Sequence, residues 1–232
     1  MKNSFIVLLT FLSFYVSHSQ SSNSEAISVE KQVLNFSKMI GDQVVAVNSL
    51  YKLIALEGEN STYKDTLAYI YFSGRKYGPT YMMTAEVLKR EPDHMEMLEM
   101  NAIALESLGA LEKAAEAYTV LLAKTKNNYQ GYTLANVYFK MKKFDEAYVA
   151  IKNTEILNDE GKYQVTFAIN KNHTQQVELL AAIPYLKGLI EIKLKNNEGA
   201  KASFTQALKV QPDFVLAKEN LEAVQKYGAE NN

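Results

Sequence analysis

The feature that most constrains this chain is an internal period of about 34 residues, which appears in two columns of mostly small side chains. The first column contains Leu34, Ala68, Ala102, Ala135 and Gly188. The second contains Ala46, Thr80, Ala114, Ala147 and Ala200. In both columns the successive members are 34, 34, 33 and 53 residues apart. Because a fixed period of this length is typical of stacked supersecondary units, the sequence predicts a repeat protein with one continuous core.

Within one period, the pattern predicts two helices joined by a tight turn. In residues 95–127, Ala102 lies on the first helix, Gly109 marks the turn, and Ala114 and Tyr118 lie on the second helix. Where two helices cross at close range, a side chain larger than alanine forces them apart, and such overpacking costs roughly 1–3 kcal/mol. The two columns therefore mark the crossing of the helices in each unit.

The period, together with small, aromatic and proline residues at fixed places, resembles the tetratricopeptide repeat (TPR) family. The last unit shows this best, through Gly188, Ala200, Phe204, Ala207 and Pro212. The resemblance implies an all-α, right-handed α-solenoid of about five helical hairpins. The expected units are residues 27–60, 61–94, 95–127, 128–161 and 181–214. A polar-backed helix over about 215–228 is expected to cap the stack.

An insertion at about 162–180 accounts for the longer last gap. Apolar and polar residues alternate from Tyr163 to Ile169, and residues 170–173 provide a turn, so the sequence predicts a β-hairpin. An isolated hairpin is marginal in water, so its apolar face must pack on something. It either closes a gap in the helical stack or forms one wall of a binding groove. Such an insertion resembles those of exported TPR proteins of the Bacteroidetes type.

The first 19 residues have the pattern of a secretory signal peptide. Lys2 precedes an apolar run from Phe5 to Val16, and small residues Ser17 and Ser19 follow. This run is shorter than the roughly 20 residues that a membrane-spanning helix needs. We expect cleavage before Gln20, leaving 20–232 as a single domain in the periplasm or outside the cell, without membrane insertion. Retention of the segment as an anchor is the alternative.

The composition argues against several classes of function. The chain has no cysteine, so thiolate catalysis and thiolate metal sites are excluded. Its 25 Lys and Arg residues balance 26 Asp and Glu residues, which makes nucleic acid a poor candidate partner. The three histidines form no evident dyad, and no phosphate loop or nucleophile motif is present. We therefore expect no catalytic residues, cofactor or metal.

The candidate site is a stripe of side chains on the first helices of the units, the side that is concave in TPR proteins. Spacings of three and four residues place its members on one helical face. The stripe contains Tyr69, Phe72, Glu99, Glu106, Tyr129, Tyr132, Asn136, Phe139 and Tyr185. Such an aromatic and acidic groove suits an extended peptide that carries apolar or basic side chains, and the predicted function is an exported scaffold or adaptor for a protein partner. Two alternatives stay open. The stripe is a small-ligand or glycan site, or its aromatic residues pack against the inserted hairpin, the C-terminal helix or the next inner helix.

Overall fold

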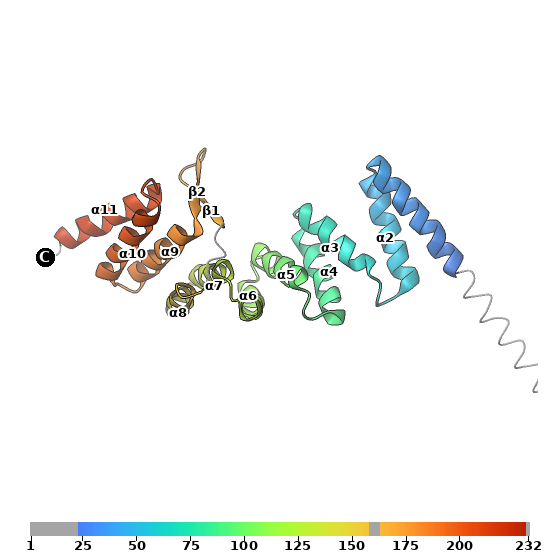
Figure 1. Ribbon diagram of the computed structural model, residues 1–232, viewed down its shortest axis with the longest axis horizontal. Helices are drawn as coiled ribbons and strands as arrows, with labels where there is room; N and C mark the ends of the chain where they lie inside the picture. Colours follow the sequence, from blue (N-terminus) through green and yellow to red (C-terminus); the bar gives the residue numbers. More distant parts are fainter. Residues whose placement is uncertain (1–22, 158–162, 231–232) are drawn as a thin grey trace, which may run out of the picture. The chain divides into compact units, whose positions relative to one another are not determined.

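The computed structural model describes residues 23–157 and 163–230 (Figure 1). The predicted signal peptide, residues 1–19, lies outside the described residues. The chain separates into an N-terminal unit that ends at Ala104 and a C-terminal unit that begins at Leu105. The prediction of a single domain over 20–232 stays a prediction. Among the described residues, no helix has the length and apolar character needed to cross a membrane.

From residue 23 onward, the N-terminal unit is built of helices and the turns between them. A helix over residues 23–40 precedes α2 (Gln43–Glu57), α3 (Tyr63–Ser73) and α4 (Tyr77–Arg90), and α5 (Met95–Ser107) begins within this unit. Asp42 caps α2, because its side chain accepts a hydrogen bond of 3.0 Å from the Val45 backbone N–H. Leu50, Leu53 and Leu67 are fully buried in the core between these helices.

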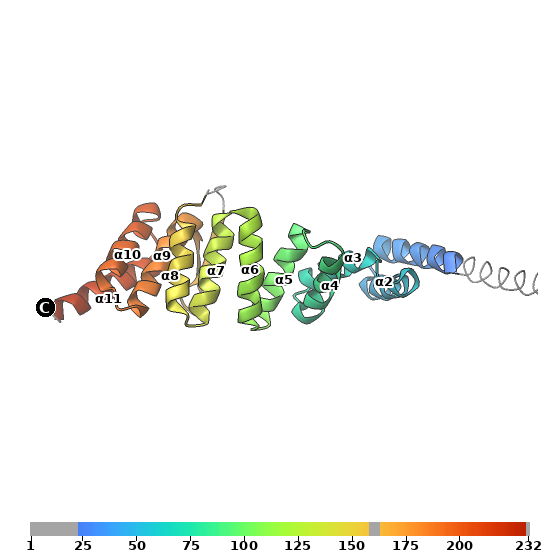
Figure 2. The same cartoon turned by 90° about the horizontal axis from the view of Figure 1, so that it is seen from below.

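The C-terminal unit continues with the same helical hairpins and contains the insertion. Its elements are α6 (Leu111–Thr125), α7 (Asn128–Lys140), α8 (Phe144–Thr154), β1 (Gln164–Ala168), β2 (Thr174–Glu178), α9 (Leu179–Lys193), α10 (Asn197–Val210) and α11 (Val215–Glu230). Helices α6 to α10 lie side by side in sequence order, and α11 closes the end (Figure 2). The predicted fold is confirmed: an all-α, TPR-type solenoid with an inserted β-hairpin and a C-terminal capping helix.

The small columns are buried where the helices of each hairpin cross. Ala68, Ala102, Ala114, Ala147 and Ala200 are fully buried. At Gly188, an added Cβ atom would lie 2.6 Å from the Phe204 ring, closer than real side chains approach. A larger residue at these alanine and glycine positions would therefore push the two helices apart.

One turn joins the two helices in each of the five hairpins. Its central residue has a positive φ angle: 77° at Gly41, 53° at Arg75, 75° at Gly109, 61° at Lys142 and 60° at Lys195. The next residue always donates a backbone hydrogen bond across the turn to the preceding helix, as in the 3.0 Å bond from Lys143 N to Tyr138 O. Gly109 was predicted as a turn residue, and Gly41 is the other glycine among the five. The other three are not glycine, although the left-handed region disfavours them.

The inserted hairpin is a two-stranded antiparallel sheet. Gln164 pairs with Glu178 at one end, and Ala168 pairs with Thr174 at the other. Side chains alternate between exposed and covered along β1, where Val165 and Phe167 face the helices, and Val177 of β2 is fully buried. The alternation therefore serves the purpose predicted from the sequence, because the apolar face packs on the helical stack.

Candidate interaction surface

In the N-terminal unit, the predicted site residues are Tyr69 and Phe72 of α3 and Glu99 of α5. Tyr69 is exposed, whereas Phe72 and Glu99 are half-buried. The Tyr69 hydroxyl donates a hydrogen bond to the Glu96 carboxylate. This bond raises the pKa of Tyr69 to about 12, because the carboxylate accepts a hydrogen bond only from the protonated hydroxyl and its negative charge repels a phenolate. Tyr69 of α3 and Glu96 of α5, which are the first helices of neighbouring hairpins, thus contact each other at the surface.

In the C-terminal unit, two of the predicted aromatic residues are buried. Only 7% of Tyr132 and 5% of Tyr185 is exposed, and both belong to the unit's hydrophobic core. Burial raises the pKa of both hydroxyls, because a phenolate loses its hydration there. Tyr129, Asn136 and Phe139 are half-buried.

The inserted hairpin covers part of the predicted stripe. The Tyr163 ring stacks on Tyr129 with a centroid distance of 4.7 Å and an interplanar angle of 21°. Phe167 meets Tyr185 edge to face at 5.4 Å, and it also lies 5.2 Å from Phe214. These geometries are favourable for aromatic pairs. Tyr129 and Tyr185 therefore pack against the hairpin, one of the alternatives left open by the sequence, and their role in binding stays a prediction.

Two glutamine side chains attach β2 to the turn between α10 and α11. Gln175 donates to the backbone oxygen of Asp213 at 2.8 Å and accepts from the backbone N–H of Val215 at 3.0 Å. Gln211 donates to the backbone oxygen of Gln176 at 3.2 Å and accepts from the N–H of Glu178 at 3.0 Å. Each amide satisfies one donor and one acceptor, so we name this pair the glutamine clasp. Sequence reasoning missed it, since neither glutamine belongs to a recognisable motif.

On α7, Asn136 and Phe139 have no ring contact with the described residues of the hairpin, and the Phe139 ring lies 5.7 Å from the Phe144 ring of α8. The neighbouring charge on α5 is balanced within the unit. Glu106 accepts a 2.6 Å salt bridge from Lys140 and a 2.9 Å hydrogen bond from the Tyr118 hydroxyl. The Glu106 carboxylate is thus paired, and this part of the stripe is less acidic than the sequence alone suggested.

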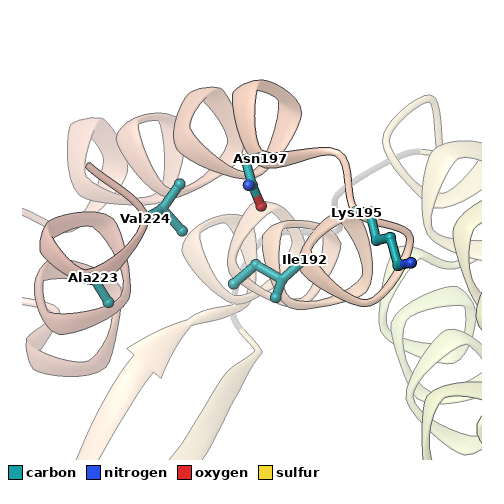
Figure 3. A pocket seen from close by; sticks show the side chains of 5 residues that line it. All are labelled: Ile192, Lys195, Asn197, Ala223 and Val224. Atoms are coloured by element: carbon teal, nitrogen blue, oxygen red, sulfur yellow. The ribbon is translucent and has the colours of Figure 1, made fainter. Parts of the chain in front are cut away.

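A shallow depression of about 490 Å³ lies at the C-terminal end of the unit (Figure 3). Its lining residues are Ile192, Lys195, Asn197, Ala223 and Val224. The Lys195 side chain extends away from Val224 in this view. In the part of the chain that the structure describes, no group of three or more His, Cys, Asp or Glu side chains is arranged to hold a metal ion.

Comparisons with known proteins agree with this architecture. Residues 183–214 match the family model described as tetratricopeptide repeat. No curated protein matches the sequence.

Solved structures with a similar fold include YrrB, described as a TPR protein with an unusual peptide-binding site. It is 16% identical, and the match covers 85% of this chain and 96% of YrrB with a TM-score of 0.61. A MamA structure is 15% identical over 71% of this chain and 80% of its own, with a TM-score of 0.58. MamA from Desulfovibrio magneticus RS-1 is 12% identical over 82% and 97%, also with a TM-score of 0.58. At these identities the likeness establishes the fold.

Proposed function

We propose that this chain, whose fold is that of tetratricopeptide repeat proteins, is an exported, non-enzymatic scaffold that binds a protein partner through the concave side of its helical hairpins. The fold it shares with YrrB supports this, since YrrB is described as having a peptide-binding site. A stack of helical hairpins offers a long, preformed surface, so the protein itself loses little freedom when an extended segment binds.

The observation that carries the proposal is the half-exposed strip of α7 that contains Asn136 and Phe139. Asn136 and Phe139 lie on this strip with a polar amide and an aromatic ring half-exposed. The hairpin forms one wall, held in place by the aromatic contacts of Tyr163 and Phe167. The Glu106–Lys140 salt bridge pairs the Glu106 carboxylate, which belongs to the same predicted stripe. A partner segment with apolar and hydrogen-bonding side chains fits this surface best.

Glycan binding is the weaker reading of the same surface. A sugar ring would need the open face of a tyrosine, but Tyr129 is stacked on Tyr163 and Tyr185 is engaged with Phe167. These two tyrosine rings of the stripe are therefore engaged in contacts within the protein.

The test is to select binders from a displayed library of random peptides on the immobilised protein, and to measure their affinities by titration calorimetry. Asn136→Arg places a long charged side chain on the half-exposed strip, and it should weaken binding by about tenfold or more. Asn153→Arg is the matched control, because Asn153 is exposed on α8, the second helix of the same hairpin. Equal affinities for both variants would show that the partner binds elsewhere. Tyr132→Ala should lower the melting temperature, since Tyr132 belongs to the core.

Export rests on the pattern in residues 1–19 and requires its own test. Cell fractionation followed by intact-mass analysis should find the protein outside the cytoplasm with Gln20 as its first residue. A mature chain that still begins at Met1 would count against cleavage.

A further inference from the structure

The two edges of the inserted hairpin differ in how their backbone groups are satisfied. Leu179 N bonds to Tyr163 O at 2.9 Å, and Ile169 N bonds to His173 O at 2.9 Å. With the observed register, the odd-numbered residues of β1 therefore exchange hydrogen bonds with β2. The N–H and C=O groups of Gln164, Thr166 and Ala168 point the other way, toward the outer edge of β1.

The outer edge of β2 is covered by the chain itself. The Gln211 amide binds the outward C=O of Gln176 and the outward N–H of Glu178, as a neighbouring strand would. On β1, the outward groups of Gln164, Thr166 and Ala168 have no hydrogen-bond partner within residues 23–157 and 163–230. One edge is closed by the glutamine clasp, and the other is open.

The open edge also lacks the usual protection against pairing. Exposed edge strands commonly contain lysine, proline or a bulge that prevents a further strand from adding. Residues Gln164–Ala168 contain no charged residue and no proline, and the register with β2 is unbroken. This edge therefore retains the full hydrogen-bonding pattern of a strand.

We propose that the outer edge of β1 is a docking site for an extended peptide segment, which pairs with Gln164–Ala168 as a third, antiparallel strand. This rests on the proposed function and gives the partner its conformation. Main-chain hydrogen bonds supply the affinity in such strand addition, and alternate side chains supply the specificity. The added strand continues the two faces of β1: one is the covered face of Val165 and Phe167, and the other is the exposed face of Gln164 and Thr166.

This placement defines the chemistry of the segment. Side chains that point toward the helices join the side of Val165 and Phe167, so they should be apolar. Side chains that point to solvent stand beside Gln164, Thr166 and Ala168, so they should be small or polar. The segment is uncharged, alternates apolar and polar residues, and has no proline at the pairing positions.

A peptide fits this edge better than a second copy of the chain does. An added strand needs only about 4.8 Å beside β1. A second copy would bring its own α7, which is tied to β1 through the stack of Tyr163 on Tyr129. Two helical stacks would then have to share the space that one strand occupies.

Amide hydrogen exchange, measured by NMR for each residue of the intact protein, shows directly whether the backbone N–H groups at this edge are hydrogen-bonded. The probe is the acetylated and amidated peptide Thr-Val-Thr-Val-Thr-Val-Thr. In the free protein, the amides of Val165 and Phe167 should exchange slowly and that of Thr166 should exchange rapidly. With saturating peptide, the Thr166 amide should slow by about tenfold or more. A Thr166 amide that is already slow in the free protein, or that is unchanged with the peptide present, overturns the proposal.

A pair of proline variants provides the matched control. Thr166→Pro removes the outward N–H at the centre of the open edge, whereas Gln176→Pro makes the same change opposite it on β2. Both remove the Thr166–Gln176 side-chain hydrogen bond, and neither removes a β1–β2 ladder bond. Thr166→Pro should weaken the peptide by about tenfold, and Gln176→Pro should leave its affinity close to that of the wild type. Equal effects overturn the proposal.

If Thr166→Pro melts at a lower temperature than Gln176→Pro, N-methylated peptides decide instead. Methylation of the threonine nitrogens blocks an antiparallel strand, whereas methylation of the valine nitrogens does not.

A dimer that dissociates in Thr166→Pro would identify a second copy as the occupant and overturn the peptide proposal. If the selected peptides bind Thr166→Pro but no longer bind Asn136→Arg, the scaffold proposal is supported and the strand pairing is overturned. Peptides that keep their affinity for both variants would overturn both the proposed binding surface and the strand pairing.

Discussion

Replacing Lys195 with glycine should stabilise the C-terminal unit, although glycine usually weakens a protein. Lys195 has a φ angle of 60° in the turn between α9 and α10. For a residue with a Cβ atom, this region costs about 1–2 kcal/mol. Glycine removes that cost. It also makes the unfolded chain more flexible, which lowers the free energy of unfolding by about 0.4–1 kcal/mol. The net expected gain in the free energy of unfolding is about 0.5–1 kcal/mol.

The matched control is Lys201→Gly, which makes the same change within α10. Lys201 is exposed and helical, so glycine there costs about 0.5–1 kcal/mol. Urea denaturation of both variants and the wild type should place Lys195→Gly above the wild type and Lys201→Gly below it. Differential scanning calorimetry should show a matching change of about 2–4 °C per kcal/mol. If Lys195→Gly is neutral or destabilising, the turn geometry does not carry the assigned strain, or the lysine side chain compensates for it.

Three further predictions concern packing and ionisation. Phe167→Ala should lower the free energy of unfolding by about 3 kcal/mol, because the ring packs in an aromatic cluster under the hairpin; a loss below about 1 kcal/mol in urea denaturation would contradict that packing. Ala147→Leu should cost about 1–3 kcal/mol through overpacking, whereas exposed Ala123→Leu should be nearly neutral by the same assay. Glu96→Gln should lower the pKa of Tyr69 from about 12 toward its ordinary value. Since a raised tyrosine pKa favours the neutral form, the Tyr69–Glu96 contact stabilises the fold below about pH 10 and is lost as the pH rises through 12, which an ultraviolet titration of that tyrosine detects.

The fold was predictable because one local rule repeats. Each helical crossing needs a small residue, so the columns through Ala114 and Ala147 reveal the period without any three-dimensional information. The turns were less visible. Arg75, Lys142 and Lys195 adopt the same left-handed conformation as Gly109, but only a glycine indicates this conformation in a sequence. The turn hydrogen bonds and the packing of the flanking helices impose the conformation, and the local preference of the residue yields to them.

The candidate site was predictable only in part. Alternation from Tyr163 to Ile169 indicated a hairpin with an apolar face, and its existence is confirmed. Where that face packs depends on Phe214 and Gln211, which are more than 30 residues further along the chain. A helical stripe also shows only which residues share a face. Whether the chain itself covers that face is decided by such long-range contacts, and this is why Tyr185 is buried.

The placement of the inserted hairpin changes how cooperatively the C-terminal unit should unfold. In a simple solenoid each repeat contacts only its neighbours, so the end of the stack frays one repeat at a time. Here the hairpin contacts Tyr129 on α7, Tyr185 on α9 and the residues between α10 and α11. Detaching α11 therefore also breaks contacts to the hairpin, and losing the hairpin uncovers α7. Coupling beyond nearest neighbours makes the last two repeats and the cap behave as one cooperative block.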